Sequence, residues 1–197
     1  MALNIHKILA DTLLKLCKEK KLENITIKDL LNETGISRQT FYNRFRDKAD
    51  LIQWTYEHTV LSEFHKAGET ATYYENTLNY CRALENYRFF MKQAYQLEGQ
   101  NNLRDWIFHY AAEYDYEWHR RHYNGEDLPE DFKFISHYHS IASIYMEMEW
   151  ICADDTDRRS PEEMARTITQ ARRISMSDTY FGPNNQIYEL RITGESK

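Results

Sequence analysis

Residues 26–48 read TIKDLLNETGISRQTFYNRFRDK, and their apolar side chains recur at helical spacing in two places. The side chains that share a face are Ile27, Leu30 and Leu31 in the first place, and Phe41, Tyr42 and Phe45 in the second. Between the two, Gly35 can adopt a positive φ without a Cβ penalty, and Ser37 can cap the helix that follows. The pattern predicts a helix-turn-helix, with residues 37–40 at the end of the second helix that enters a DNA major groove.

Residues typical of helix N-termini occur within this region and just after it. Thr26 and Asp29 have the spacing of a capping box, in which the hydroxyl accepts from a backbone N–H that has no helical partner. Asp47 and Asp50 place two acids near the positive end of a third helix. A small three-helix packing unit with no role at DNA is the alternative. The agreement of caps, glycine position and apolar period favours the helix-turn-helix.

The same region resembles the N-terminal domain of TetR-type transcriptional regulators. The matching segments are Thr26-Ile27-Lys28-Asp29-Leu30, Thr34-Gly35-Ile36-Ser37, Thr40-Phe41-Tyr42-Asn43-Arg44-Phe45 and Asp47-Lys48-Ala49-Asp50-Leu51. Arg44 stands where an aromatic residue or His is more usual, and Arg38 and Gln39 occupy positions that vary with the operator. Residues 86–106 resemble, more loosely, the subgroup that contains activators of dihydroxyacetone kinase operons.

The resemblance implies an all-α protein that binds a palindromic double-stranded DNA operator as a homodimer. In this family the last two helices form an intermolecular four-helix bundle, and the C-terminal domain usually holds a small-molecule effector. Repression by blocking a promoter is the usual mechanism, and activation also occurs. We therefore expect a helix-turn-helix DNA-binding domain at residues 1–47 and a helical dimerisation and ligand-binding domain at residues 48–197.

Composition agrees with an all-α fold. The 197 residues are 42% hydrophobic, with only six Gly and three Pro, and no proline before Pro129 interrupts a helix. A net charge of −6 argues against indiscriminate binding to nucleic acid. The charge is uneven, however, since residues 1–60 hold ten Lys and Arg against eight Asp and Glu, a net of +2. Three widely spaced Cys, no signal peptide and no apolar run of membrane-spanning length predict a cytoplasmic protein with no membrane partner.

Apolar periodicity and turn signals predict about nine helices. Besides the two of the helix-turn-helix, they are expected at residues 4–21, 48–67, 70–84, 87–97, 103–123, 131–153 and from 161 to before 182. Ser160-Pro161-Glu162-Glu163 starts the last of them, with Ser as cap, Pro at the first helical position and Glu at the third. A break is expected at Glu85 and Asn86, with Asn86 as a cap. Residues 124–129 predict a turn, and the chain after Gly182 predicts an irregular tail.

Eight residues are candidates for contacts to DNA: Thr26, Ser37, Arg38, Gln39, Thr40, Tyr42, Asn43 and Lys48. Three of them can read base edges, because Arg38 can pair with guanine, Gln39 with adenine, and the Thr40 methyl can meet a thymine methyl. Such contacts carry the sequence information of a protein–DNA interface.

Other candidates suit the phosphates, which position a protein without reading sequence. The resemblance supports Thr26, Tyr42 and Lys48 in that role. Asn43 and Arg44 fit either a DNA contact or an ordinary exposed polar face, and the sequence leaves both readings open.

The C-terminal part of the chain offers a row of aromatic residues. Trp106, Tyr110, Tyr114 and Trp118 recur every four residues and so line one side of a helix. The row fits a ligand-binding wall, and it also fits a plain aromatic core. His137 and His139 lie two residues apart and point to opposite sides of a helix, which disfavours a metal site. No nucleophile–base pair, phosphate loop or catalytic acid pair is present, so we expect neither enzyme activity nor a cofactor.

Two hypotheses follow from these observations. The favoured one is a dimeric TetR-type regulator, possessing a DNA-reading N-terminal part and an effector-binding C-terminal part. The alternative is an interaction protein that docks on DNA and recruits a partner protein through its C-terminal domain. A tightly packed C-terminal domain without a ligand cavity would favour the alternative.

Overall fold

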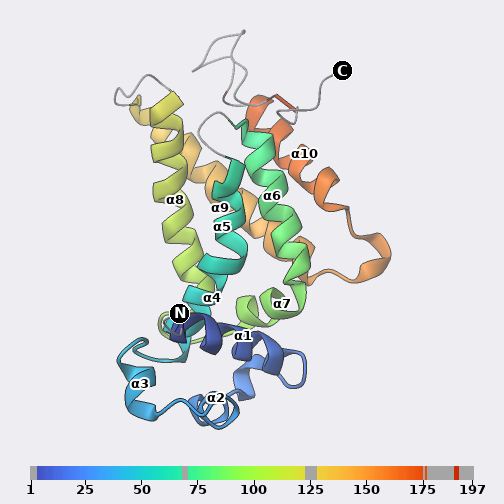
Figure 1. The fold of residues 1–197 in the computed structure, drawn as a ribbon. Helices are drawn as coiled ribbons and strands as arrows, with labels where there is room; N and C mark the ends of the chain where they lie inside the picture. Colours follow the sequence, from blue (N-terminus) through green and yellow to red (C-terminus); the bar gives the residue numbers. More distant parts are fainter. Residues whose placement is uncertain (1–3, 68–70, 123–127, 175, 177–188, 191–197) are drawn as a thin grey trace. The chain divides into compact units, whose positions relative to one another are not determined.

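The computed structural model describes residues 4–67, 71–122, 128–174, 176 and 189–190, among which there are helices and no β-strand (Figure 1). The α-helices are α1 (Ile5–Cys17), α2 (Ile27–Thr34), α3 (Arg38–Tyr42), α4 (Lys48–Tyr56), α5 (Ser62–Phe64), α6 (Tyr73–Asn86), α7 (Arg88–Gln96), α8 (Leu103–His122), α9 (Glu130–Cys152) and α10 (Pro161–Arg172). Shorter elements are the 3-10 helices η1 (Leu22–Asn24), η3 (His65–Ala67) and η4 (Asp155–Asp157), and the π-helix η2 (Glu57–Leu61). Because α4, η2 and α5 follow one another without a gap, they count as one helix. The described residues then form the nine helices expected, and the all-α prediction is confirmed for them.

Two compact units divide the chain. One, here called the head, contains Met1–Thr59 and Tyr87–Trp106, and the other, called the body, contains Val60–Asn86 and Ile107–Lys197. The head therefore includes α7, which is distant in sequence from α1–α4. The functional boundary expected after residue 47 stays a prediction, because compactness does not test it.

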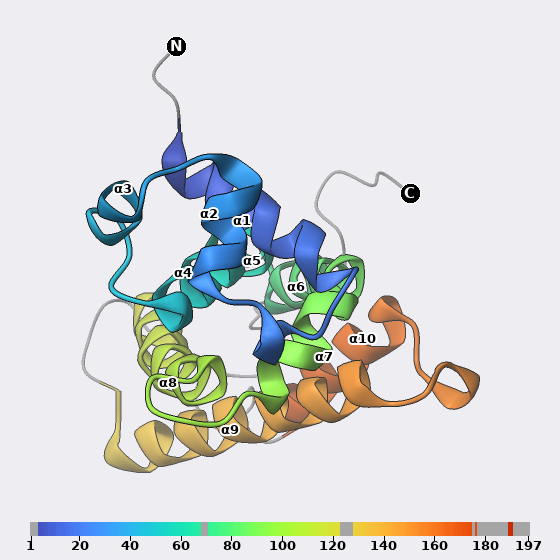
Figure 2. The same ribbon diagram turned by 90° about the horizontal axis from the view of Figure 1, so that it is seen from below.

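In the head, α1 lies against both α2 and α4 (Figure 2). The apolar side chains buried there are Leu9, Leu13, Leu22, Ile25, Leu30, Phe41, Phe45 and Leu51. Full burial of such a side chain stabilises the fold by about 1.5–3 kcal/mol relative to leaving it exposed. The core therefore draws on every helix of the N-terminal region and on the turns that join them.

Side chains fix the starts of the head's helices as the sequence predicts. Thr26 Oγ1 accepts from the backbone N–H of Asp29 at 3.2 Å, and the Asp29 carboxylate accepts from the backbone N–H of Thr26 at 2.7 Å. This capping box starts α2, and Gly35 ends α2 with a φ of +70°. Ser37 caps α3 and Asp47 caps α4 through their side-chain oxygens. The predicted helix-turn-helix is thus present in α2 and α3.

Two helices of the head are shorter than expected. α1 ends at Cys17 rather than at residue 21, because the chain turns to bring Leu22 and Ile25 into the core. α3 ends at Tyr42, and Phe45 reaches the core from the turn that follows. Where α1 and α3 end is therefore determined by tertiary burial. The apolar period of the sequence does not show where that burial occurs.

Elsewhere the observed boundaries differ by up to three residues. α6 continues through Asn86, so that residue does not cap the next helix, and Tyr87 precedes α7 without a side-chain cap. The last helix begins as predicted, with a capping box between Ser160 and Glu163. The turn expected at residues 124–129 and the tail lie largely outside the described residues.

The core of the body contains a buried ion pair between α8 and α10. Arg172 Nη1 donates to Asp115 Oδ1 at 2.7 Å, and both side chains are buried. Ser136 Oγ donates to the same carboxylate, and His119 Nδ1 lies 3.4 Å from it. Burial alone would raise the pKa of Asp115, but Arg172, His119 and Ser136 hold that pKa below its ordinary range. Loss of one partner would leave a buried charge uncompensated, at a cost of about 3–5 kcal/mol.

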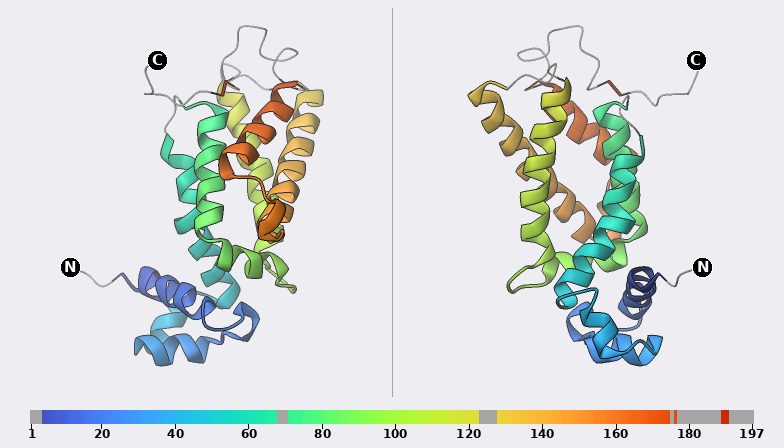
Figure 3. Two further views of the ribbon diagram at one scale, coloured as in Figure 1. Left: turned by 90° about the vertical axis from the view of Figure 1, so that its right-hand side faces the viewer. Right: turned by 60° about the vertical axis from the view of Figure 1, so that its left-hand side comes forward.

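α10 packs along α6 in the body (Figure 3). Ile168 and Ala165 of α10 are buried, and so are Leu78 and Cys81 of α6. One face of α10 therefore belongs to the core of a single chain, which limits how much of that helix remains for contacts with another molecule.

Glu147 should make the stability of the body depend on pH. Its carboxyl is buried in α9, and burial raises its pKa from 4.5 to about 8. Between these values the folded chain holds a proton that the unfolded chain has released, so the free energy of unfolding falls as pH rises. We expect Glu147→Gln to gain stability over the wild type by up to ~1.4 kcal/mol per pH unit from pH 5 to pH 8. Urea unfolding at fixed protein concentration measures this difference. Glu149→Gln, on the exposed face of the same helix, is the control and should show no such pH dependence. If the stability difference between Glu147→Gln and the wild type were the same at every pH, the raised pKa of Glu147 would be contradicted.

Candidate nucleic-acid interface

The five-residue helix α3 presents polar side chains on a buried anchor. Phe41 is completely buried, and Arg38, Gln39, Tyr42 and Asn43 around it are exposed. Because α3 is so short, the burial of Phe41 rather than a long hydrogen-bond ladder determines which of its sides faces outward. The exposed side carries donors and acceptors suited to base edges and phosphates.

The exposed side chains of α3 are ordered by contacts one helical turn apart. Gln39 Nε2 donates to Asn43 Oδ1 at 3.0 Å. The Arg38 guanidinium lies over the Tyr42 ring at 5.5 Å from its centre, and Arg38 Nη2 is 3.4 Å from the Tyr42 hydroxyl. Pairs at this spacing stabilise an isolated helix by only about 0.2–0.5 kcal/mol, so they orient the side chains without preventing exchange for DNA contacts.

The side chains of Ser37 and Thr40 form hydrogen bonds with each other and with the backbone at the start of α3. Ser37 Oγ accepts from the backbone N–H of Thr40 at 3.1 Å, and the two hydroxyl oxygens are 2.9 Å apart. Thr40 is half-buried, unlike Gln39 beside it. The Ser37 hydroxyl therefore caps α3 and the Thr40 hydroxyl is bonded to it, and the predicted contacts of both to DNA remain predictions.

Thr26 is also engaged within the protein. Its backbone N–H and its hydroxyl both donate to Asp29 Oδ2, each at 2.7 Å. Lys20 Nζ lies 2.8 Å from the same oxygen, and its hydrogen bond, together with those from Thr26, lowers the pKa of Asp29. A phosphate would have to replace Asp29 as the acceptor for Thr26, so this geometry supports a role in starting α2.

Lys48 differs most from its predicted role as a phosphate contact. Its ammonium donates to the carbonyl oxygens of Leu22 at 2.9 Å, Glu23 at 3.1 Å and Ile25 at 2.8 Å. An ammonium has three donors, and all three are satisfied by these bonds. In this structure Lys48 joins α4 to the segment before α2 rather than offering a donor to DNA.

Positive charge near α3 comes from three arginines, of which Arg46 is not among the residues predicted to contact DNA. Residues 35–46 contain three arginines and no acidic residue. Arg44 and Arg46 follow α3 and are exposed, and the Arg46 side chain, 80% exposed, lies 3.5 Å from Asp50. Counting charge over this short window is the sequence signal that would have added Arg46 to the candidates.

The aromatic row of α8 is divided between the two units. In the head, Trp106 contacts Tyr56 edge to face at 6.0 Å between ring centres. In the body, Trp118 is buried and contacts Tyr73 in the same manner at 5.6 Å, so it is a core side chain.

Tyr110 and Tyr114 form the middle of the row. Their rings stack at 6.0 Å, both are half-buried, and His65 Nε2 lies 3.1 Å from the Tyr110 hydroxyl. A ligand-binding role for Trp106, Tyr110 and Tyr114 stays a prediction, whereas the packing of Trp118 is already explained by the core.

Metal ligands and reactive thiols are the other chemistry that the described residues could offer. They contain no group of three His, Cys, Asp or Glu side chains that could hold a metal ion. His119 and His122 lie three residues apart on α8, and the side chain of His122 lies outside what is described. Burial raises the pKa of the Cys17 thiol to about 12, and burial likewise raises that of Cys81, so both stay protonated. No helix in the described part of the chain is long and apolar enough to cross a membrane.

Comparison with known proteins gives this geometry a family. Residues 9–53 match the family described as bacterial regulatory proteins, tetR family, and residues 71–173 match the family described as transcriptional regulator C-terminal region. The second match alone spans more than half of the chain. Together they confirm the TetR-type resemblance of the helix-turn-helix and extend it to the body.

Individual relatives agree with the family matches. The chain is 25% identical over 156 residues to the HTH-type dhaKLM operon transcriptional activator DhaS of Lactococcus lactis subsp. lactis (strain IL1403). The aligned region covers 74% of this chain and 79% of that protein. The solved structure of a dihydroxyacetone kinase operon activator DhaS has the same fold, with a TM-score of 0.65 and 20% identity over 84% of this chain and 92% of that one. The chain belongs to the TetR family and is a DNA-binding transcriptional regulator.

Proposed function

We propose that this regulator binds a palindromic operator as a homodimer, with α3 of each subunit in the major groove. The observation that carries the proposal is the exposed polar side of α3, held outward by the buried Phe41. Two identical readers related by a two-fold axis match a palindrome when they lie about one helical turn of DNA apart. A protein that binds operator DNA must reach that DNA, so the proposal includes a cytoplasmic location. Members of this family are generally not enzymes, and the proposal requires no catalysis.

Within α3 we assign base reading to Arg38 and Gln39, whose planar groups can bond bidentately to guanine and adenine. Tyr42 and Arg46 serve the phosphates, because the first is 44% exposed with a hydroxyl donor and the second is a largely exposed cation. Asn43 supports Gln39 through their hydrogen bond. This division separates residues that select a sequence from residues that supply affinity for any DNA.

The proposed dimer interface lies on α9. Four large apolar side chains follow one another at helical spacing and are exposed: Phe134, Tyr138, Ile141 and Tyr145. Phe134 is 72% exposed and Tyr138 is 61% exposed, which is costly for a monomer in water. In the family that this chain belongs to, the last two helices commonly pair between subunits, so a second copy is the occupant we propose for this face.

The named relative is an activator of a dihydroxyacetone kinase operon. We infer from that similarity that this chain also acts at the promoter of an operon. Activation and repression both require the same bound dimer, and they differ in where the operator lies relative to the polymerase site.

Replacing Arg38 or Gln39 by Ala should relax base preference. Each variant should lose about 1–3 kcal/mol at one operator position and little on scrambled DNA, because only base contacts distinguish the two duplexes. Arg46→Ala is the contrast, and it should weaken both duplexes alike. Fluorescence anisotropy with duplexes carrying single base changes measures these effects. Identical losses for all three variants on cognate and scrambled DNA would show that the division of roles is incorrect.

Salt dependence should separate Lys48 from Arg46. Each cation that neutralises a phosphate contributes about one unit to the slope of log affinity against log salt. Arg46→Ala should therefore lower the slope by about one, whereas Lys48→Met should weaken binding with the slope unchanged, because its donors face carbonyl oxygens. A drop in slope for Lys48→Met would instead show that Lys48 contacts phosphate in the complex.

A charge in the exposed stripe of α9 should split the dimer. Tyr138→Glu should weaken subunit association by at least about 2 kcal/mol and leave a folded monomer, because this side chain makes few contacts within its own subunit. Ile168→Glu is the contrast, since Ile168 is only 6% exposed and a charge there should unfold the body. Analytical ultracentrifugation and circular dichroism measure both outcomes. A Tyr138→Glu protein that stays dimeric would show that the stripe serves another partner, as in the interaction-protein hypothesis.

A further inference from the structure

The chain between α1 and α2 has backbone groups that neither helix can satisfy. Residues 18–25 form a turn and the single 3-10 turn η1, and only the side chains of Leu22 and Ile25 in this segment are fully inside the core. Buried or half-buried backbone groups require partners, since each one left unpaired costs about as much as a lost hydrogen bond. In the head those partners are side chains from two other helices, α4 and α7.

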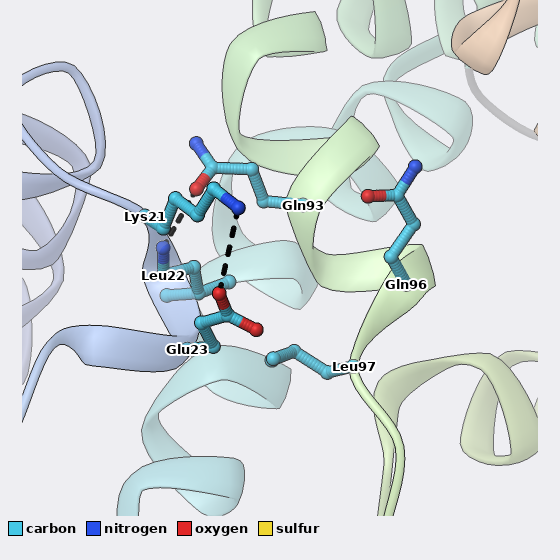
Figure 4. A pocket seen from close by; sticks show the side chains of 6 residues that line it. All are labelled: Lys21, Leu22, Glu23, Gln93, Gln96 and Leu97. Atoms are coloured by element: carbon cyan, nitrogen blue, oxygen red, sulfur yellow. Dashed lines mark hydrogen bonds and ion pairs between the residues drawn. The ribbon is translucent and has the colours of Figure 1, made fainter.

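Gln93 of α7 supplies one set of partners. Its Oε1 accepts from the backbone N–H of Leu22 at 2.6 Å (Figure 4). Its Nε2 donates to the carbonyl of Cys17 at 3.1 Å. Nε2 also donates to the carbonyl of Phe89, one turn earlier in α7, at 2.9 Å. Only an amide in this orientation satisfies both an N–H and a carbonyl, so the two bonds fix which atom is oxygen and which is nitrogen.

Lys48 of α4 supplies the other set, through its bonds to the carbonyls of Leu22, Glu23 and Ile25. Leu22 is thus bonded on its N–H side by α7 and on its carbonyl side by α4. Ile25 directly precedes Thr26, the residue that caps α2. The position of the segment therefore determines where the helix-turn-helix begins.

We propose that Gln93 is a positioning residue for DNA binding: with Lys48 it holds residues 22–25, and through them it sets the pose of α2 and α3. The inference rests on the proposed function, since it assumes that α3 is the reader. Gln93 lies outside residues 9–53, the segment that matches the N-terminal family, and inside residues 71–173, which match the C-terminal one. A residue of the C-terminal sequence region is therefore built into the DNA-binding head.

The neighbouring Gln96 provides a matched comparison. It lies three residues later in α7, borders the same hollow, and makes neither of the two bonds to residues 17 and 22 (Figure 4). Met has nearly the same length and helix propensity as Gln, so Gln93→Met and Gln96→Met change the same chemistry at two places on one helix.

The experiment uses the full chain and two duplexes, one selected by the wild type from a randomised pool and one a scrambled version of it. In Gln93→Met we expect the Leu22 amide hydrogen to exchange about tenfold faster, as loss of one hydrogen bond implies. We also expect affinity for the selected duplex to fall about tenfold and affinity for the scrambled duplex to fall much less. Gln96→Met should match the wild type in all three measurements. Circular dichroism melting of both variants confirms that they are folded at the assay temperature.

Two results would overturn the inference while leaving the proposed function intact. One is faster Leu22 exchange in Gln93→Met with an unchanged ratio of affinities for the two duplexes, which would make the bonds merely structural. The other is unchanged exchange at Leu22, which would show that the bonds do not persist in solution. A wild-type protein that selects no duplex would overturn the proposed function, and this inference with it.

Discussion

Three hydrogen bonds from the ammonium of Lys48 to the carbonyls of Leu22, Glu23 and Ile25 hold the head in its arrangement. Burial lowers the pKa of this lysine. The three carbonyl oxygens offset the cost of burying the charge by accepting a hydrogen bond from each of its N–H groups. The lysine is the first residue of α4, directly after the Asp47 cap. Its side chain therefore joins α4, which follows α3, to residues 22–25, which precede α2. The proposed reader α3 is only five residues long, so its position depends on this bracing more than on hydrogen bonds of its own.

The body uses a different solution, a buried charge pair. Arg172 of α10 and Asp115 of α8 neutralise one another, and Ser136 of α9 adds a bond to the same carboxylate. The Arg172 guanidinium also lies over the Tyr73 ring of α6 at 4.7 Å. Side chains from four helices thus converge on one ion pair. Apolar residues of the same volume would often give equal or greater stability, so the pair's clearest structural consequence is a defined register among these helices.

The sequence was informative wherever the partners are close along the chain. The capping boxes of Thr26 with Asp29 and of Ser160 with Glu163 span three residues each, and both start their helices where they were expected. The resemblance predicts a phosphate contact for Lys48, whereas its three carbonyl acceptors, 23 to 26 residues earlier, become neighbours only after folding and gave no local signal. Gln93 bonds a residue 71 positions away and gave no local signal at all. Helical period likewise predicted a helix at residues 131–153 without telling which of its apolar side chains a single chain would leave exposed.

Connectivity explains why the helix-turn-helix alone does not set the geometry of the reader. The chain passes between head and body three times, after Thr59, Asn86 and Trp106, and the first and last of these points lie inside the helical elements η2 and α8. A helix tends to move as one piece, because its backbone hydrogen bonds lie within the helix itself. A π-helical turn such as η2 interrupts the regular α-helical bonding, and such turns often occur at functional sites. The middle crossing leads directly into α7 and so to Gln93. Donor–acceptor distances in protein hydrogen bonds are about 2.7–3.2 Å, so a shift of α7 by about 1 Å would break the bond between Gln93 and the Leu22 N–H. Lys48 would then be the only one of the two side chains still holding residues 22–25.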